Sequence, residues 1–252
     1  MNTTGQSLSK VPAVTLIFWI IKIAATTLGE TAGDAVSMSM NLGYLLSTGI
    51  FAVIFVIAVA AQIRAEKFHP YLYWVTIVAT TTVGTTMADF ADRSLGIGYA
   101  GGSSLLFVLL MASLAIWYKT LGSVAVSTIS STRAESFYWI TIMFSQTLGT
   151  ALGDWTADTA GLGYLGGTAI FLVLLGVVAV LYLFTRTSRT FLFWAAFILT
   201  RPLGAVVGDF LDKPVSDGGM ALSRYSASAA LIVFMIVCIM IFPQRAAQRT
   251  GH

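Results

Sequence analysis

The chain has 252 residues, of which 57% are hydrophobic and 10% are charged, and its formal net charge is +3. Soluble domains carry about 25% charged residues, so this composition excludes an ordinary soluble protein and indicates an integral membrane protein. No basic nucleic-acid patch and no phosphate-binding glycine loop is present. We therefore expect the lipid bilayer as a partner, no nucleic acid, no cofactor and no enzymatic activity.

Eight apolar runs come close to the roughly 20 residues that a helix needs to span the hydrocarbon core. They lack the alternation typical of membrane β-barrel strands. The first run is too long for the core of a cleavable signal peptide, and the lone Cys238 excludes an internal disulfide. In chain order the predicted spans are approximately 13–34, 45–63, 71–90, 102–118, 137–155, 165–184, 191–210 and 226–242.

The predicted spans form four tandem copies of one two-span unit. Each copy has a tryptophan, a glycine ten residues later and an aspartate five residues after that glycine. The tryptophans are Trp19, Trp74, Trp139 and Trp194, and the glycines are Gly29, Gly84, Gly149 and Gly204. We place the repeats at approximately 13–63, 71–118, 137–184 and 191–242, in halves 1–125 and 126–252 of a single membrane domain, 1–252.

Two spans per copy return the chain to its starting side, so all four copies have the same orientation. Parallel repeats are related by an axis along the membrane normal. The predicted fold is therefore an all-α polytopic membrane protein of eight transmembrane helices with pseudo-fourfold or nested twofold symmetry. Cations at the termini and between copies place both termini in the cytoplasm: they are Lys10, Arg64, Lys67, Lys119, Arg133, Arg186, Arg189, Arg245 and Arg249.

The repeated motif has the form G-x-x-x-[G/A]-D, as in "GETAGD", "GTTMAD", "GTALGD" and "GAVVGD". Small residues four apart share one helix face and allow a second helix to approach closely within lipid. The motif therefore predicts that the first helix of each copy presses against a neighbour while carrying a carboxylate at the edge of that contact.

Eight of the 11 acidic residues lie in the motif region, in pairs three or four residues apart that share a helix face. They are Glu30 and Asp34, Asp89 and Asp92, Asp154 and Asp158, and Asp209 and Asp212. A charge at the bilayer centre costs about 3 kcal/mol and usually marks a site. The alternative is an interfacial position, where Arg93 and Lys213 form ordinary ion pairs with these acids. Because carboxylates are unfavourable at a helix C-terminus, we expect the helix to continue or a cation to compensate.

A second polar position lies three residues before each motif glycine. Its residues are Thr26, Thr81, Gln146 and Arg201. They either line a water-filled path or form hydrogen bonds between helices, and Arg201 is a candidate counter-charge for the acidic cluster. For the tryptophans, packing or an interfacial belt is favoured over a cation–π cage for an organic cation.

With four tandem two-span copies, each carrying one tryptophan and the G-x-x-x-[G/A]-D motif, the chain resembles a bacterial membrane-protein family known as a repeat of unknown function. The resemblance covers roughly residues 13–242. It implies a multi-pass protein of the bacterial inner membrane with eight helices, and it supplies no substrate.

The leading functional prediction is a secondary transporter or channel for a small cation, such as Mn²⁺, Mg²⁺, Ca²⁺, Na⁺ or H⁺, which hard oxygen ligands suit. An alternative is a membrane scaffold or sensor subunit whose acids stabilise helix ends, and a third is an intramembrane hydrolase. The ion and the formation of a homo-oligomer are left open. The predicted metal ligands are Asp34, Asp89, Asp154 and Asp209, and the further binding residues are Glu30, Asp158, Arg201 and Gln146.

Overall fold

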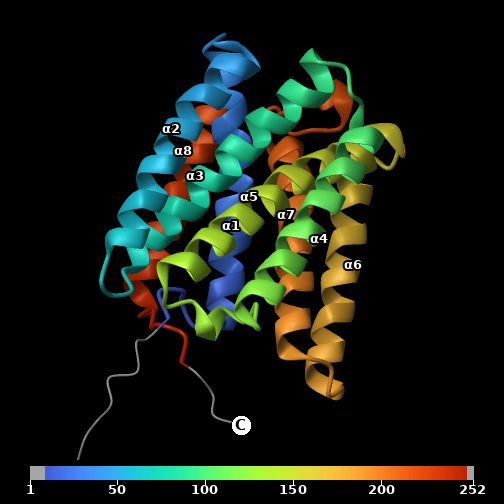
Figure 1. Cartoon of the computed structure of the whole chain (residues 1–252). Coiled ribbons are helices and arrows are strands. Elements are labelled where there is room, and N and C mark those ends of the chain that lie inside the picture. The colour runs from blue at the N-terminus through green and yellow to red at the C-terminus, as the bar shows by residue number, and fades with distance from the viewer. Residues whose placement is uncertain (1–8, 249–252) are drawn as a thin grey trace, which may run out of the picture.

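The computed structural model describes residues 9–248, which form eight long α-helices and no β-strand beyond one isolated bridge (Figure 1). This confirms the all-helical fold and its four copies of a helix pair; Arg249 lies outside the described residues. The helices are α1 (Leu16–Asp34), α2 (Gly43–Arg64), α3 (Pro70–Asp89), α4 (Tyr99–Leu121), α5 (Thr132–Asp154), α6 (Gly163–Phe184), α7 (Arg189–Asp212) and α8 (Arg224–Ile241).

The first helix of each copy begins at a side chain that caps its free backbone N–H groups. Ser131, for example, accepts a hydrogen bond from the Ala134 N–H at 3.2 Å, at the start of α5. The second helices of the first three copies begin at a glycine with positive φ instead, where other residues are strained. These glycines are Gly43, Gly98 and Gly163.

The first helices of the four copies form an inner ring. Within it α1 packs on α3, α3 on α5, α5 on α7, and α7 back on α1. Each second helix packs against the inner helix of the following copy: α2 on α3, α4 on α5, α6 on α7, and α8 on α1. The copies therefore interlock, and the last copy joins the first to complete the ring.

Six of the eight helices are long and apolar enough to cross a membrane: α1, α2, α4, α6, α7 and α8. The other two, α3 and α5, belong to the inner ring and are rich in threonine and other polar residues. Their threonines are buried, as Thr81, Thr85 and Thr150 show. The exposed surfaces of the outer helices are strongly apolar by contrast, with Leu45 and Leu165 each 64% exposed.

All four copies run in the same direction. Both ends of the described chain and the three connections between copies lie at one end of the bundle, which we call the terminal end (Figure 1). The connections within copies lie at the opposite end, which we call the motif end, and each motif aspartate is on this side.

The motif glycines lie where neighbouring inner helices approach one another. A Cβ atom at each glycine would clash with, or at Gly84 crowd, the residue three positions before the motif glycine of an adjacent copy. These contacts pair Gly29 with Thr81, Gly84 with Gln146, Gly149 with Arg201, and Gly204 with Thr26. The motif glycine and the polar position are therefore two sides of one contact, repeated around the ring.

Candidate functional site

Each inner helix contributes a row of buried side chains four residues apart, a ridge that packed helices commonly share. Equivalent positions in the four copies form five layers, and every member is at most 6% exposed. From the terminal end, the layers are Phe18, Tyr73, Tyr138 and Phe193; Lys22, Ile77, Ile142 and Phe197; Thr26, Thr81, Gln146 and Arg201; Glu30, Thr85, Thr150 and Ala205; and Asp34, Asp89, Asp154 and Asp209. The interior thus changes from aromatic to anionic along the bundle.

The first layer is aromatic and lies at the terminal end. Tyr73 and Tyr138 contact each other through their hydroxyl groups at 2.6 Å, and the Phe18 and Phe193 rings lie 6.3 Å apart. Among the repeated tryptophans, Trp74 and Trp139 are at most 2% exposed beside this layer. Packing therefore explains the repeated tryptophans better than an exposed interfacial belt.

Replacing Tyr138 with phenylalanine is expected to cost about 1–3 kcal/mol, because the buried Tyr73 hydroxyl loses its partner. The double variant Tyr73→Phe/Tyr138→Phe gives the layer four phenylalanines and is expected to recover most of that loss. Thermal unfolding of purified protein in detergent measures both effects. A double variant no more stable than Tyr138→Phe alone would contradict a specific hydroxyl pair.

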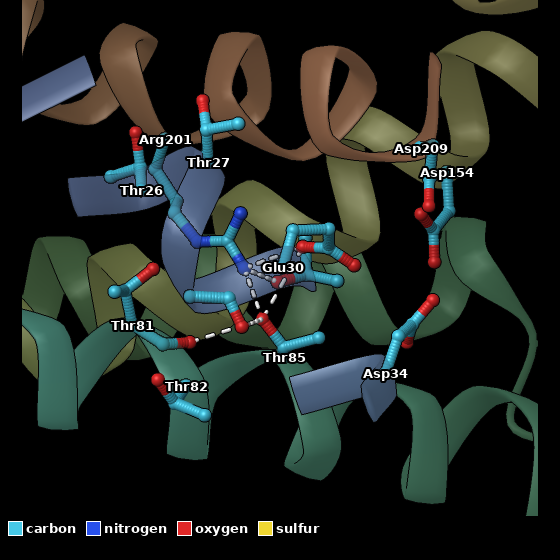
Figure 2. A network of polar contacts seen from close by, with 12 residues as sticks. Thr26, Thr27, Glu30, Asp34, Thr81, Thr82, Thr85, Asp154, Arg201 and Asp209 are labelled. Atoms are coloured by element: carbon cyan, nitrogen blue, oxygen red, sulfur yellow. Dashed lines mark hydrogen bonds and ion pairs between the residues drawn. The ribbon is translucent and has the colours of Figure 1, made fainter. Parts of the chain in front are cut away.

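Arg201 joins all four inner helices near the middle of the ring. Its guanidinium, carried by α7 and fully buried, donates to the Glu30 carboxylate at 2.9 Å, to the Thr85 hydroxyl at 2.6 Å and to the Thr150 hydroxyl (Figure 2). The predicted counter-charge role is thus realised with Glu30 as the ion-pair partner. Gln146, also predicted as a site residue, is fully buried one layer further toward the terminal end than Glu30.

The four motif aspartates form the layer nearest the motif end, and each is only 1–3% exposed. After Asp34, Asp89 and Asp154 the chain continues in a π-helical turn, so these carboxylates do not lie at frayed helix ends. Asp209 lies within α7, which continues to Asp212. We call these four residues the carboxylate layer.

Carboxylates from different helices converge in this region. One oxygen from each of Glu30, Asp154 and Asp209 lies within 4.8 Å of the others, and the same holds for Asp34, Asp209 and Asp212. Asp209 belongs to both groups, and all members are buried. Such carboxylate groups offer the oxygen ligands that hard cations prefer. Figure 2 shows Asp34, Asp154 and Asp209 gathered beside the Glu30–Arg201 pair.

Two cations bridge the carboxylate layer in pairs. Arg93 contacts Asp89 at 2.8 Å and Asp154 at 3.6 Å. Lys213, the equivalent residue in copy four, contacts Asp34 at 2.5 Å and Asp209 at 3.2 Å. The two cations thus pair with motif aspartates of two adjacent copies, and the arrangement repeats between the two halves of the chain.

A surface pocket of about 350 Å³ lies over the carboxylate layer at the motif end. Asp209 and Lys213 line it together with Asp158, which is exposed here rather than buried with the other predicted acids. Asp212, absent from the predicted ligand set, is 8% exposed and pairs with Arg224 at 2.7 Å. Its position three residues after Asp209 is the sequence signal that could have included it.

Four segments of the chain match the family described as Repeat of Unknown Function (DUF347): residues 17–68, 72–123, 137–188 and 192–245. Neither a curated protein nor a solved structure matches the chain. The four matched segments together cover most of the sequence and correspond to the four helix pairs of the ring. The chain therefore belongs to this family of four tandem repeats.

Proposed function

We propose that the protein spans the bacterial inner membrane and conducts a small cation, as a secondary transporter or channel, with the carboxylate layer as its binding site. The observation that carries the proposal is that four repeated aspartates, each from a different helix, lie in one layer shielded from solvent, and that three of them join groups of converging carboxylates. Burying several carboxylates together is costly unless cations compensate them. Selection for a cation-binding role explains why all four copies carry this cost.

The distribution of apolar and basic residues supports the membrane placement. The outer helices direct apolar side chains away from the bundle, as a lipid-facing surface requires. Basic residues at the terminal end, among them Arg64, Lys119 and Arg133, place that end in the cytoplasm by the positive-inside rule. On this proposal all eight helices span the bilayer, and α3 and α5 tolerate their polar sequences because the other helices surround them.

The buried acids at the motif end offer oxygens that their present partners leave unmatched. Within residues 9–248, one buried oxygen each of Asp34 and Asp212 has no hydrogen-bond partner. Both residues belong to the group that also includes Asp209, and Asp209 is the member that lines the surface pocket. An entering Mn²⁺, Mg²⁺ or Na⁺ ion would engage these oxygens and compete with Lys213 for Asp34 and Asp209. The aromatic layer closes the path at the terminal end, so passage requires a second conformation.

The scaffold hypothesis fits the geometry less well. If the acids only stabilised helix ends, they could do so at the solvent-exposed surface. Their burial in the ring would then only add the free-energy cost of losing hydration. An intramembrane hydrolase would need one carboxylate dyad sharing a water, whereas the aspartate recurs in every copy. Both arguments favour a symmetric ion-binding layer.

Replacement of Asp34, Asp89, Asp154 and Asp209 together by asparagine is expected to reduce cation flux in proteoliposomes to the level of empty vesicles. Asparagine keeps the side-chain shape and removes the charge that attracts the ion. Flux of Mn²⁺, Mg²⁺, Na⁺ and H⁺ should each be measured, with gel filtration to verify that the variant folds. The matched control, Asp217→Asn, removes an exposed carboxylate at the pocket rim and should retain wild-type flux. Unchanged flux in the quadruple variant would rule out the proposal.

A further inference from the structure

A second group of charged and polar side chains lies deeper in the ring, between the aromatic layer and the carboxylate layer. Lys22 is fully buried and shares its layer with Ile77, Ile142 and Phe197, none of which can accept a conventional hydrogen bond. The Lys22 ammonium lies 4.1 Å from the centre of the Phe197 ring. The other copies thus supply only apolar side chains at this depth, and copy one alone supplies a cation.

Several buried donors around Lys22 have no acceptor. In the part of the chain that the structure describes, the Lys22 Nζ, the Nε and Nη1 of Arg201 and the Gln146 Nε2 are donors without an acceptor, and the Gln146 Oε1 is an acceptor without a donor. The Thr81 hydroxyl is likewise without a hydrogen-bond partner among these residues. Arg201 and Gln146 belong to the layer next to Lys22, one helical turn or about 6 Å further along the inner helices.

Within the described chain Lys22 has no buried counter-charge, unlike Arg201. The layers that contain Lys22 and Arg201 hold no acidic side chain, and Arg201 pairs with Glu30 of the next layer, whereas Lys22 has no ion-pair partner among residues 9–248. A buried cation without a partner is strongly unfavourable, and each unpaired buried donor adds to the cost. One monovalent anion would pair with the Lys22 ammonium and accept hydrogen bonds from the free donors.

We propose that Lys22, Arg201 and Gln146 form a binding site for a small monovalent anion, such as a halide, nitrate or formate. Water alone would satisfy the donors but leave the positive charge uncompensated. A cation is excluded because the free groups are mainly donors and the local charge is already positive. The site differs from the carboxylate layer in position and in the sign of its ligand, and it does not depend on the proposed cation transport.

Anion-dependent stability of the purified full-length protein tests this site. The protein is kept in detergent at constant ionic strength, and sodium gluconate, whose anion is bulky, is replaced stepwise by chloride, nitrate or formate. Ligand that binds only the folded state raises the unfolding temperature, and saturation is expected to raise it by about 3 °C or more. An unfolding temperature that is the same in gluconate and in all three small anions would overturn the proposal.

Lys22→Ile is the informative variant, because copies two and three already carry isoleucine at this position. It should fold at least as well as wild type in gluconate and lose the response to small anions. Lys119→Met, which removes an exposed cation from α4, is the matched control and should keep the response. Gln146→Leu leaves the charges intact and is expected to weaken the apparent anion affinity several-fold. An equal response in wild type and Lys22→Ile would show a general salt effect and reject the site.

Discussion

Replacing Arg201 with threonine is expected to destabilise the protein by about 3–5 kcal/mol, the cost of leaving a buried ion-pair partner alone. Threonine occupies the equivalent position in copies one and two, so the ring already accommodates this side chain in two of its four copies. Without Arg201, the carboxylate of Glu30 lies 3% exposed beside the Asp154 and Asp209 carboxylates. Thr85 and Thr150 lose a donor as well.

The double variant Glu30→Thr/Arg201→Thr tests why Arg201→Thr is destabilising. It removes both members of the ion pair, so that no unpaired Glu30 charge is left in the interior. Copies two and three carry threonine where copy one has Glu30, so the double variant makes both layers more symmetric. We expect it to recover most of the stability lost in Arg201→Thr. Arg133→Thr, at an exposed position, is the control and should change the unfolding free energy by less than about 0.5 kcal/mol. A double variant as unstable as Arg201→Thr would show that Arg201 acts through packing rather than charge.

Much of this architecture could be predicted from the internal repeats of the sequence. The recurrence of tryptophan, glycine and aspartate at fixed spacing predicted four parallel helix pairs, and the small residues of the motif predicted close inner contacts. The composition of the five layers could also have been predicted from the four-residue spacing within each inner helix. Counting back by fours from Asp34 gives Glu30, Thr26, Lys22 and Phe18, and the same count in the other copies gives equivalent positions.

Other features depend on tertiary geometry that periodicity does not encode. Sequence position gave the approximate depth of Asp34 and favoured burial, but it left interfacial exposure as an alternative. The ring resolves this, because neighbouring copies cover each carboxylate. Pairing of Lys213 with Asp34 joins residues 179 positions apart and requires that copy four lie beside copy one. Asp158 was predicted as a binding residue, and the structure places it in the π-helical turn after Asp154, exposed in the lining of the surface pocket.

Replacing Gly204 with valine is expected to prevent the ring from assembling, so that little folded protein is recovered. Gly204 lies where α7 meets α1, the contact by which copy four closes on copy one. A Cβ built there would lie 2.8 Å from the backbone carbonyl carbon of Thr26, and backbone atoms cannot move aside without displacing the helix. The two branched methyl groups of valine add further overlap, and overpacking of a tight contact costs more as the volume rises.

The matched control is Gly176→Val in the outer helix α6. Nothing lies within 4 Å of a Cβ added at Gly176, and valine is a better helix former than glycine. This variant should be recovered at wild-type yield and unfold at or slightly above the wild-type temperature. Yield of monodisperse protein by gel filtration and the thermal midpoint in detergent compare the two. Because both changes add the same atoms to a helix, a difference between them measures the closeness of the α1–α7 contact. Equal behaviour would mean that α1 and α7 do not meet through Gly204, and the closed ring that gathers the carboxylates would then lose its support.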